Sequence, residues 1–507
     1  MTAVGAFPNA KRQATVCGAY TATAANGSVS DAPADDPGLL SAAQTSLLID
    51  QYELAMAASY LERRMNQPSI FELFVRELPP GRDWLLVAGL GPALRMVSEM
   101  RFGDQELRYL ERSGFRPALL RFLERFQFSG QVDAIPEGTV VFAGEPLVRV
   151  TAPRIEAQLL ETLLLNQINF QTAIATKAAR IVLAAGGGEV GAGHRVIDFS
   201  PRRDHGADAA MKAARAAGIA GVRGTSNVAA AMRYGMSPVG TMAHSYVMSF
   251  ADEQHAFEAF MQDTPENAIM LVDTYDTLNG VRHAIAASRV TGVQLKGVRL
   301  DSGDLLALSR ATRALLDEVG MQHTAIVASG DLEEHQIAKL VRLRAPIDMW
   351  GVGTELGTSK DAPALGGVYK LVADAAPDGG WHPVWKRSPA KATIPGPKQV
   401  FRTFRDRTMT SDLVAEATEQ CTGLALLEPF VARGEVIRRE SLQTLRMRAS
   451  ENLRSLPRAL RHPEPQGAAP YRVVFSERLV RLSNASTSIA ECQLATVLRP
   501  RGRLQIN

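Results

Sequence analysis

Cysteine is scarce in this chain of 507 residues, and its scarcity argues against two kinds of stabilising site. The three cysteines, Cys17, Cys421 and Cys492, lie far apart, and no two of them form a Cys-x-x-Cys pair. An odd, scattered set favours neither a disulfide framework nor a cysteine zinc site. A chain with few thiols suits a reducing compartment, so we expect a cytoplasmic protein.

An excess of one charge and a long apolar run are also missing. The chain has 56 Lys and Arg residues against 53 Asp and Glu, a formal net charge of +3. So small a charge argues against a nucleic-acid surface as the main function. No apolar run approaches the length of a membrane span, so we expect neither a nucleic acid nor a membrane as a partner. The 46% hydrophobic and 21% charged residues are typical of a soluble globular protein.

Acidic residues are absent from the chain before Asp31. Residues 1–38 are rich in Ala, Gly, Ser and Thr and show no apolar period. An organelle transit peptide shares this composition, but arginine is scarce and no amphipathic helix is evident. We therefore predict a disordered N-terminal tail over 1–38. The last segment, 483–507, has no usable pattern and stays unassigned.

The most informative pattern lies between residues 269 and 354, where an apolar run followed by a helix-like segment occurs four times. The runs end at intervals of 28, 28 and 25 residues, at Asp273, Asp301, Ser329 and Thr354. A buried parallel strand and its crossover helix take about thirty residues. Two earlier runs, at 195–200 and 237–241, extend the series to six units. The equal spacing and polar strand ends favour an α/β barrel over a doubly wound sheet.

Around this series the chain has the pattern of mixed α+β structure. We predict an N-terminal α+β domain over 39–185, with a helix at 47–65, a strand at 69–79, hairpins at 131–152 and a long connecting helix from 153. The barrel is assigned to 186–412. A C-terminal α+β segment follows over 413–482.

Carboxylates stand at two neighbouring strand ends of the predicted barrel. Asp301 and Asp273 each end an apolar run, and polar groups at such ends converge on the face where barrel enzymes act. Two carboxylates brought together repel each other unless a cation or substrate lies between them. Asp304, and one of Asp273 and Asp276, are also explained as helix caps.

Glycine-rich turns follow the next two runs. Ser329-Gly330-Asp331 and Gly353-Thr354 lie at the ends of successive strands, where backbone N–H groups of small turns bind phosphate. In barrels the phosphate site commonly follows the last two strands. An ordinary capping box of Asp331 with Glu334 is the competing explanation for the first turn.

Two further groups belong to the same predicted face. Arg202 and Arg203 follow the run at 195–200, and paired arginines suit a pyrophosphate or carboxylate, although a solvated surface pair is nearly as good an explanation. His244 comes three residues after Thr241, which ends another strand. A lone histidine is more often structural, but this position on the active face favours a catalytic role.

In this order the motifs resemble the nicotinate phosphoribosyltransferase family, from about Leu47 to about Leu482. The matching segments are LLIDQYELAMAASY, SPRRDHGAD, GTSNVAAAMRYG, VGTMAHSYVMSF, LVDTYDTLNG, GVRLDSGDLL, GVGTELGT and GGVYKLV. The resemblance implies an irregular, TIM-like α/β barrel beside an α+β open-faced sandwich built from both chain ends. It implies transfer of phosphoribose from 5-phosphoribosyl 1-pyrophosphate to nicotinate in NAD biosynthesis. It also implies coupling to ATP hydrolysis, and a homodimer.

The resemblance also implies catalytic roles. His244 corresponds to the histidine that ATP phosphorylates, and Arg299 resembles the arginine at nicotinate or the reacting centre. Asp301 completes the predicted catalytic set. Tyr52 and Thr241 resemble nicotinate contacts, with Tyr52 reaching in from a partner subunit.

Phosphate and magnesium contacts follow from the same resemblance. Thr354 resembles a contact to the ribose phosphate, and Arg203 is similar to an arginine of the phosphate-rich site. Asp273 and Asp301 would manage the ribose hydroxyls and the Mg²⁺ pyrophosphate, with ATP as co-substrate. The remaining predicted substrate contacts are Ser226, Ser329, Gly330 and Gly353.

The chain departs from the family pattern at one motif. The family usually has FGLRR where this chain has FSPRR, and Asp204-His205 replace small or amide residues. Pro201 fixes its own backbone and restricts Ser200, so the position of the arginine pair is open.

Three rival functions are weighed against this one. A nicotinamide phosphoribosyltransferase would have an aspartate at the position of Ser226, and a carboxylate there would repel nicotinate. A sugar-phosphate aldolase or isomerase would need a Schiff-base lysine or a general base at a strand end. Lys296 precedes its strand and should lie at the wrong end of the barrel. The third rival is an inactive barrel that serves as a binding protein, against which His244, Asp301 and Arg299 argue.

Overall fold

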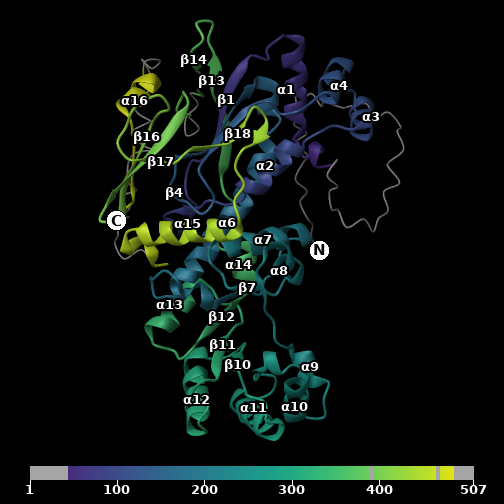
Figure 1. Cartoon of the computed structure of the whole chain (residues 1–507), viewed down its shortest axis with the longest axis vertical. Coiled ribbons are helices and arrows are strands. Elements are labelled where there is room, and N and C mark those ends of the chain that lie inside the picture. Colours follow the sequence, from purple (N-terminus) through teal and green to yellow (C-terminus); the bar gives the residue numbers. More distant parts are fainter. Residues whose placement is uncertain (1–43, 387–392, 464–468, 485–507) are drawn as a thin grey trace, which may run out of the picture.

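The computed structural model describes residues 44–386, 393–463 and 469–484 (Figure 1). The predicted tail over 1–38 lies outside these ranges, as does the segment 483–507 apart from its first two residues. The described chain is a mixed α/β protein whose two largest sheets each have seven strands. In Figure 1 a parallel sheet lies in the lower half and an antiparallel sheet in the upper half.

The parallel sheet contains the repeated runs of the sequence. Its strands, in spatial order, are β8 (Ser237–Pro238), β7 (Gly224–Thr225), β6 (Val196–Asp198), β12 (Met349–Val352), β11 (Ala325–Ala328), β10 (Gly297–Leu300) and β9 (Ile269–Leu271). All neighbouring pairs are parallel. The four runs from 269 to 354 are therefore four adjacent strands, as predicted. No ladder joins the two edge strands, β8 and β9, within the described ranges, so the sheet is a curled half-barrel.

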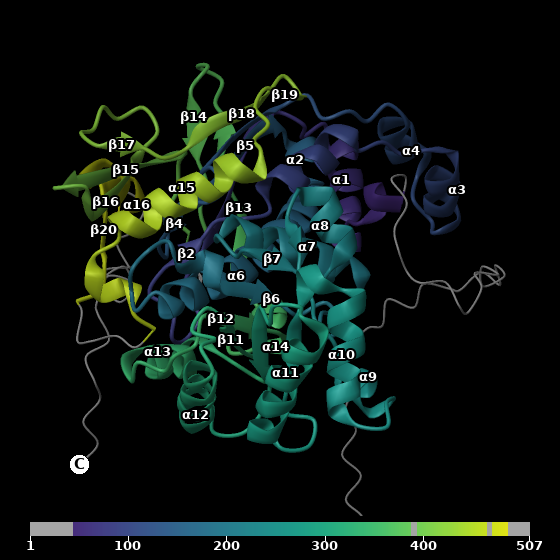
Figure 2. The same ribbon diagram turned by 60° about the horizontal axis from the view of Figure 1, so that its bottom comes forward.

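Helices follow each strand and pack around the outside of this sheet (Figure 2). They are α7 (Ala207–Ile219), α8 (Val228–Tyr234), α9 (His244–Met248), α10 (Glu253–Asp263), α11 (Thr277–Thr291), α12 (Leu305–Glu318), α13 (Glu334–Arg342) and α14 (Thr354–Thr358). Side-chain oxygens accept backbone N–H groups at the starts of several of them and so satisfy donors that lack a helical partner. The capping residues are Asn227, Asp252, Asp276, Asp304 and Glu333.

The antiparallel sheet takes its strands from both halves of the chain. In spatial order these are β14 (Trp381–Pro383), β13 (Gly367–Ala375), β1 (Pro68–Val75), β5 (Pro146–Pro153), β3 (Gln131–Ala134), β18 (Glu428–Ala432) and β19 (Glu435–Val436). The chain leaves the parallel sheet after β12, and β13 pairs with β1. Two smaller sheets join β17 (Leu424–Ala425), β15 (Lys398–Arg405), β16 (Thr408–Glu416) and β20 (Arg472–Phe475), and β2 (Leu85–Leu86) with β4 (Val140–Val141). Strands between 367 and 412, a range that we assigned to the barrel, thus belong to other sheets.

Helix α6 (Glu161–Ala185) connects the two halves. Every residue from Gln171 to Ala185 is buried, because the antiparallel part packs on one side of the helix and α7 and α13 on the other. Its many alanines permit this close approach. The other helices are α1 (Gln51–Glu62), α2 (Leu90–Glu99), α3 (Asp104–Arg112), α4 (Pro117–Glu124), α5 (Arg154–Gln158), α15 (Leu442–Ser455) and α16 (Glu477–Asn484). None of the helices in the described ranges combines the length and apolarity needed to cross a membrane.

Candidate active site at the strand ends

Arg299, on β10, contacts the ends of β10 and β11 and the loop after β8. Its Nε donates to Ser329 Oγ at 2.8 Å, and one terminal nitrogen donates to Asp301 Oδ1 at 2.8 Å. The other terminal nitrogen donates to Thr241 Oγ1 at 3.3 Å, across the gap between β10 and the loop after β8. The guanidinium also lies over the ring of Phe199, 5.3 Å from its centroid. Arg299 therefore brings together residues that the sequence placed in four separate motifs.

Asp301 is ionised within this cluster. Burial by itself raises the pKa of its carboxyl, but hydrogen bonds from Arg299 and Ser329 outweigh burial and lower the pKa below its usual value. The hydroxyl of Ser329, which is 3% exposed, donates to the same Oδ1 that Arg299 contacts. A fixed negative charge thus faces the strand-end side of the sheet.

Asp273 lies beside Asp301, as the sequence predicted for adjacent strand ends. Its Oδ2 accepts the backbone N–H of Asp301 at 3.1 Å and the hydroxyl of Ser302 at 2.6 Å. Its Oδ1 is buried and has no hydrogen-bond partner among the described residues. One carboxylate oxygen of Asp273 is therefore available to a ligand.

His244, at the start of α9, contacts the same group of loops. Its Nδ1 lies 3.1 Å from Thr274 Oγ1, the hydroxyl of the residue after Asp273. His244 is also among the groups that lower the pKa of Asp301, so the two side chains are near each other. The predicted catalytic residues His244, Arg299 and Asp301 thus lie close together.

Gly330 is required at its position by a close approach of two backbones. Its φ of +89° is in the left-handed region, and a Cβ there would lie 1.9 Å from the carbonyl oxygen of Asp301. No residue with a side chain fits this contact without moving the end of β10. The glycine predicted for phosphate binding therefore also holds the strand ends together.

The end of β6 holds a buried carboxylate that the sequence analysis did not single out. Asp198, which is 1% exposed, accepts the backbone N–H of Ser200 at 2.9 Å and the hydroxyl of Thr225 at 2.7 Å. Burial raises the pKa of Asp198, although these hydrogen bonds lower it. The sequence offered one indication of this residue, because Asp198 stands at the end of the apolar run at 195–200, where a strand-end carboxylate is expected. The hydroxyl oxygen of Ser226 is buried next to this group without a partner in the described chain.

The turn after β6 carries Arg202 and Arg203, which are both exposed. Neither guanidinium forms a hydrogen bond or ion pair with a described residue, so both are free to meet a ligand. Asp204 follows them and is half-buried. Burial, and then the nearby charge of Asp198, raise the pKa of Asp204 to about 6.

The remaining predicted residues divide between this site and a distant one. Gly353 and Thr354 form the start of α14, at the end of β12. Tyr52 lies on α1, at the opposite end of the molecule from β10 in Figure 1, so its own chain does not bring it to the strand ends. Its side chain is 47% exposed, and partial burial together with Glu161 and Glu53 raises the pKa of its hydroxyl.

The competing helix-cap explanations are resolved in three cases. Asp276 caps α11 and Asp304 caps α12, so the helix-cap explanation is confirmed for both. The capping box of Asp331 with Glu334 is wrong, because Glu333 accepts the first N–H groups of α13. Glu334 instead forms ion pairs with buried cations of α6.

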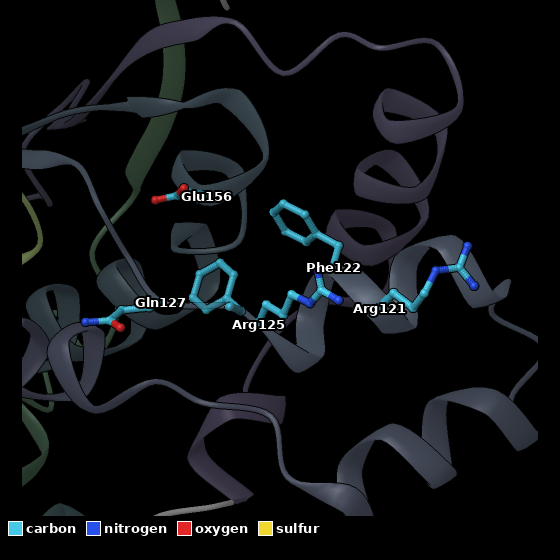
Figure 3. A pocket seen from close by; sticks show the side chains of 6 residues that line it. Arg121, Phe122, Arg125, Gln127 and Glu156 are labelled. Carbon is cyan, nitrogen blue, oxygen red and sulfur yellow. The ribbon is translucent and has the colours of Figure 1, made fainter.

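A separate surface hollow of about 430 Å³ lies in the N-terminal half (Figure 3). It is lined by Glu156 and by residues at and just after the end of α4, among them Phe122 and Arg125. In Figure 3 Arg121 points away from Glu156, so the two arginines do not converge. The strand ends of the parallel sheet remain the better candidate, because polar groups from several strands meet there.

Comparisons with known proteins agree on one family. The model of the nicotinate phosphoribosyltransferase N-terminal domain matches residues 47–169, and that of the nicotinate phosphoribosyltransferase family matches residues 194–391. A nicotinate phosphoribosyltransferase of Mycobacterium tuberculosis is 45% identical over 454 residues, which cover 88% of this chain and 95% of that protein. One of Bacillus subtilis is 42% identical over 394 residues, covering 76% and 79%. The crystal structure of human nicotinic acid phosphoribosyltransferase superposes with a TM-score of 0.72 at 28% identity, covering 86% of this chain and 99% of that one.

Proposed function

The chain belongs to the nicotinate phosphoribosyltransferase family, and from this premise we propose how its strand-end site carries out the reaction. The enzyme transfers phosphoribose from 5-phosphoribosyl 1-pyrophosphate to nicotinate, and the products are nicotinate mononucleotide and pyrophosphate. The single observation that carries the proposal is the cluster of Arg299, Asp301 and Ser329, with Thr241 and His244 beside it.

The reaction replaces one bond at the anomeric carbon of ribose. The bond from this carbon to the pyrophosphate oxygen breaks, and pyrophosphate leaves with the electron pair. The lone pair of the nicotinate ring nitrogen forms the new bond, and no proton moves at that nitrogen. The sugar passes through a cation-like state, which ionised Asp301 stabilises. Alignment of the two substrates supplies much of the rate.

Each substrate has proposed contacts. Arg299 and Thr241 hold nicotinate, and Ser226 leaves room for its carboxylate without repelling it. Arg203 meets the phosphates. The ribose phosphate lies against Ser329, Gly330, Gly353 and Thr354.

The magnesium ion that the family implies would bind at Asp273 and Asp301. The free, buried Oδ1 of Asp273 fits such an ion, which takes one or two carboxylates and completes its shell with water and substrate phosphates. No cluster of three or more metal-ligating side chains occurs in the described ranges, so substrate oxygens would provide much of the shell. When bound, Mg²⁺ neutralises the charge that grows on pyrophosphate.

ATP hydrolysis is coupled through His244. The contact of Nδ1 with Thr274 orients the ring and leaves Nε2 to attack the γ-phosphorus of ATP. The bond between this phosphorus and the bridging oxygen breaks, and ADP leaves with the electron pair. Water later hydrolyses the phosphohistidine and restores the free ring.

The proposal extends to the assembly of the enzyme. We propose that the curled sheet forms an irregular TIM-like barrel and the antiparallel part an open-faced sandwich. A homodimer in the cytoplasm would bring Tyr52 of one subunit to the nicotinate site of the other. The partly exposed Tyr52, remote from its own strand ends, supports this arrangement.

One assay tests the function. The purified chain is mixed with phosphoribosyl pyrophosphate, Mg²⁺ and either nicotinate or nicotinamide, with and without ATP, and the mononucleotides are separated by chromatography. We expect nicotinate mononucleotide, and more of it with ATP. No product from nicotinate would refute the function, and product from nicotinamide alone would support the amide-specific rival.

A further inference from the structure

The turn between β6 and α7 holds an aspartate that the reaction described above does not use. Asp204 Oδ2 accepts the hydroxyl of Ser200 at 3.1 Å, and the backbone N–H of Asp204 donates to the carbonyl of Ser200 at 3.2 Å. Ser200 is itself fully buried and is held through its backbone N–H by Asp198. Asp204 is therefore tied to the end of β6 by a continuous set of hydrogen bonds.

The other oxygen of Asp204 faces a different element. Oδ1 is buried and has no hydrogen-bond partner among the described residues. A Cβ placed on Gly357 of α14 would lie 1.9 Å from this oxygen and 2.4 Å from the Cβ of Ser200. Asp204 and Ser200 therefore pack directly against the backbone of α14, and only glycine at position 357 permits the contact.

The contact joins two parts of the proposed substrate site. Arg202 and Arg203 immediately precede Asp204, and the backbone N–H of Arg203 donates to the carbonyl of Ser200 at 2.6 Å within the same turn. Thr354 stands at the start of α14, three residues before Gly357. The exposed arginines have no partners of their own in the described chain, so the backbone of the turn decides where they point.

We propose that Asp204 is a positioning residue for the phosphoribosyl pyrophosphate site, which holds the turn of Arg202 and Arg203 against α14 through its contacts with Ser200 and Gly357. The inference rests on the proposed function of these strand ends. A shift of the turn moves both guanidinium groups relative to Thr354, and misplaced binding groups weaken the hold on a substrate without changing the reacting groups.

Steady-state kinetics on Asp204→Ala and Asp204→Asn test the proposal. We expect Asp204→Ala to raise the KM for phosphoribosyl pyrophosphate by about tenfold, with the KM for nicotinate and kcat within about twofold of wild type. Asparagine has the same shape and still accepts from Ser200, so Asp204→Asn should return this KM to within about threefold of wild type. Asp208→Asn is the matched control, since Asp208 is exposed on α7 and, among the described residues, forms its ion pair with Lys212.

Other outcomes would overturn the proposal. An unchanged KM for phosphoribosyl pyrophosphate in Asp204→Ala, or an equal change in both KM values, would show that Asp204 does not position this site. If Asp204→Ala does not fold, Ser200→Ala removes only the hydroxyl and should raise the same KM by about threefold. If the wild-type chain forms no product, the proposed function fails. In that case the positioning role is tested by itself, by calorimetric binding of inorganic pyrophosphate to wild type, Asp204→Asn and Asp204→Ala. Weaker binding to Asp204→Ala than to the other two supports the role, and equal binding to all three refutes it.

Discussion

At the scale of single residues, two strand ends of the site approach each other too closely for an added side chain between them. Gly330 shows this most directly, because its Cα faces the carbonyl oxygen of Asp301. Arg299 and Ser329 then fix the side chain of the same aspartate. A change of one methyl group in this region should therefore affect both stability and catalysis.

Gly330→Ala is expected to lower kcat/KM by about a hundredfold, since the added Cβ displaces the backbone of Asp301. Gly320→Ala is the matched control. Its φ of +78° is also left-handed, but nothing lies within 4 Å of the new Cβ. The control should cost roughly 1–2 kcal/mol of stability from backbone strain and leave kcat/KM unchanged. Equal loss of kcat/KM in both variants would contradict the role given to Gly330.

His244→Ala is expected to abolish the stimulation of product formation by ATP while leaving a slow, ATP-independent transfer. The reason is that the imidazole accepts the phosphoryl group but takes no part in the bond change at ribose. Initial rates with and without ATP measure the effect. His255→Ala is the control, because His255 is exposed on α10 and its ring pairs with the capping residue Asp252, away from the strand ends. ATP stimulation that survives in His244→Ala would refute the assignment.

A contact of the site is predictable from the sequence when a local motif or a regular repeat relates its two residues. Asp273, Asp301 and Ser329 were predictable as neighbours, because parallel strands end on one edge of a sheet. The capping box predicted at Asp331 was wrong. Glu333, two residues later, caps the helix, and the local sequence pattern does not distinguish the two positions. The contact of Asp204 with Gly357 was not predictable, because it joins positions that are far apart in the chain and have no shared periodicity.

At the scale of elements, α6 and α13 are joined by a buried set of charges. Glu334, which is fully buried at the start of α13, forms ion pairs with Lys177 and Arg180 of α6. Lys177 also contacts Glu355 of α14 and Asp361. The connecting helix is thereby fixed to the two elements that follow β11 and β12.

Glu334→Gln is expected to lower the free energy of unfolding by about 3–5 kcal/mol at neutral pH. The change takes the carboxylate away from buried Arg180 and Lys177, and Lys177 keeps only Glu355 and Asp361 as ion-pair partners among the described residues. Burial alone raises the pKa of Glu334, but Lys177 and Arg180 outweigh it and lower the pKa. The contribution of the carboxylate is therefore present above the usual pKa of a glutamate and is lost as the pH falls through the lowered pKa.

Urea unfolding at about pH 7.5 and about pH 3.5 measures this change, and the deficit of Glu334→Gln should shrink at the lower pH. Glu111→Gln is the control, since Glu111 is exposed on α3. A deficit that is the same at both pH values would mean that charge is not the cause.

Elements were predictable where their patterns are long. The helices at 47–65 and from 153, the strand at 69–79 and the four repeated runs correspond to elements of the structure. Strand β7 was missed because it has two residues, too few for a period. Whether the edge strands β8 and β9 pair with each other was not predictable either, since that depends on how strands separated in sequence curl together; no ladder joins them in the described ranges.

At the scale of the whole molecule, the proposed dimer can be tested by mixing two variants that are each defective at a different residue. If Tyr52 serves the partner's site, a dimer of one Tyr52→Ala subunit and one His244→Ala subunit has one intact site. After random exchange of equal amounts, half of the dimers are mixed, so about a quarter of the wild-type ATP-stimulated activity should return.

Subunits are exchanged under mild denaturation, and product is measured against each variant refolded alone. The mixture of wild type with His244→Ala serves as the control for exchange. No recovery above the two parent variants would show that Tyr52 acts within its own subunit or not at all.

The antiparallel sheet takes its strands from distant parts of the chain, and this has a consequence during synthesis on the ribosome. Strand β1 ends at Val75, and its partner β13 begins at Gly367, 292 positions later. A ribosome that adds about 5–20 residues per second needs about 15–60 s to cover that distance. During this time β5 can pair with one side of β1, but the other side is an open, apolar edge of the kind that aggregates. Nascent chains, and any chain truncated within the parallel sheet, should therefore depend on chaperones in a way that the finished enzyme does not.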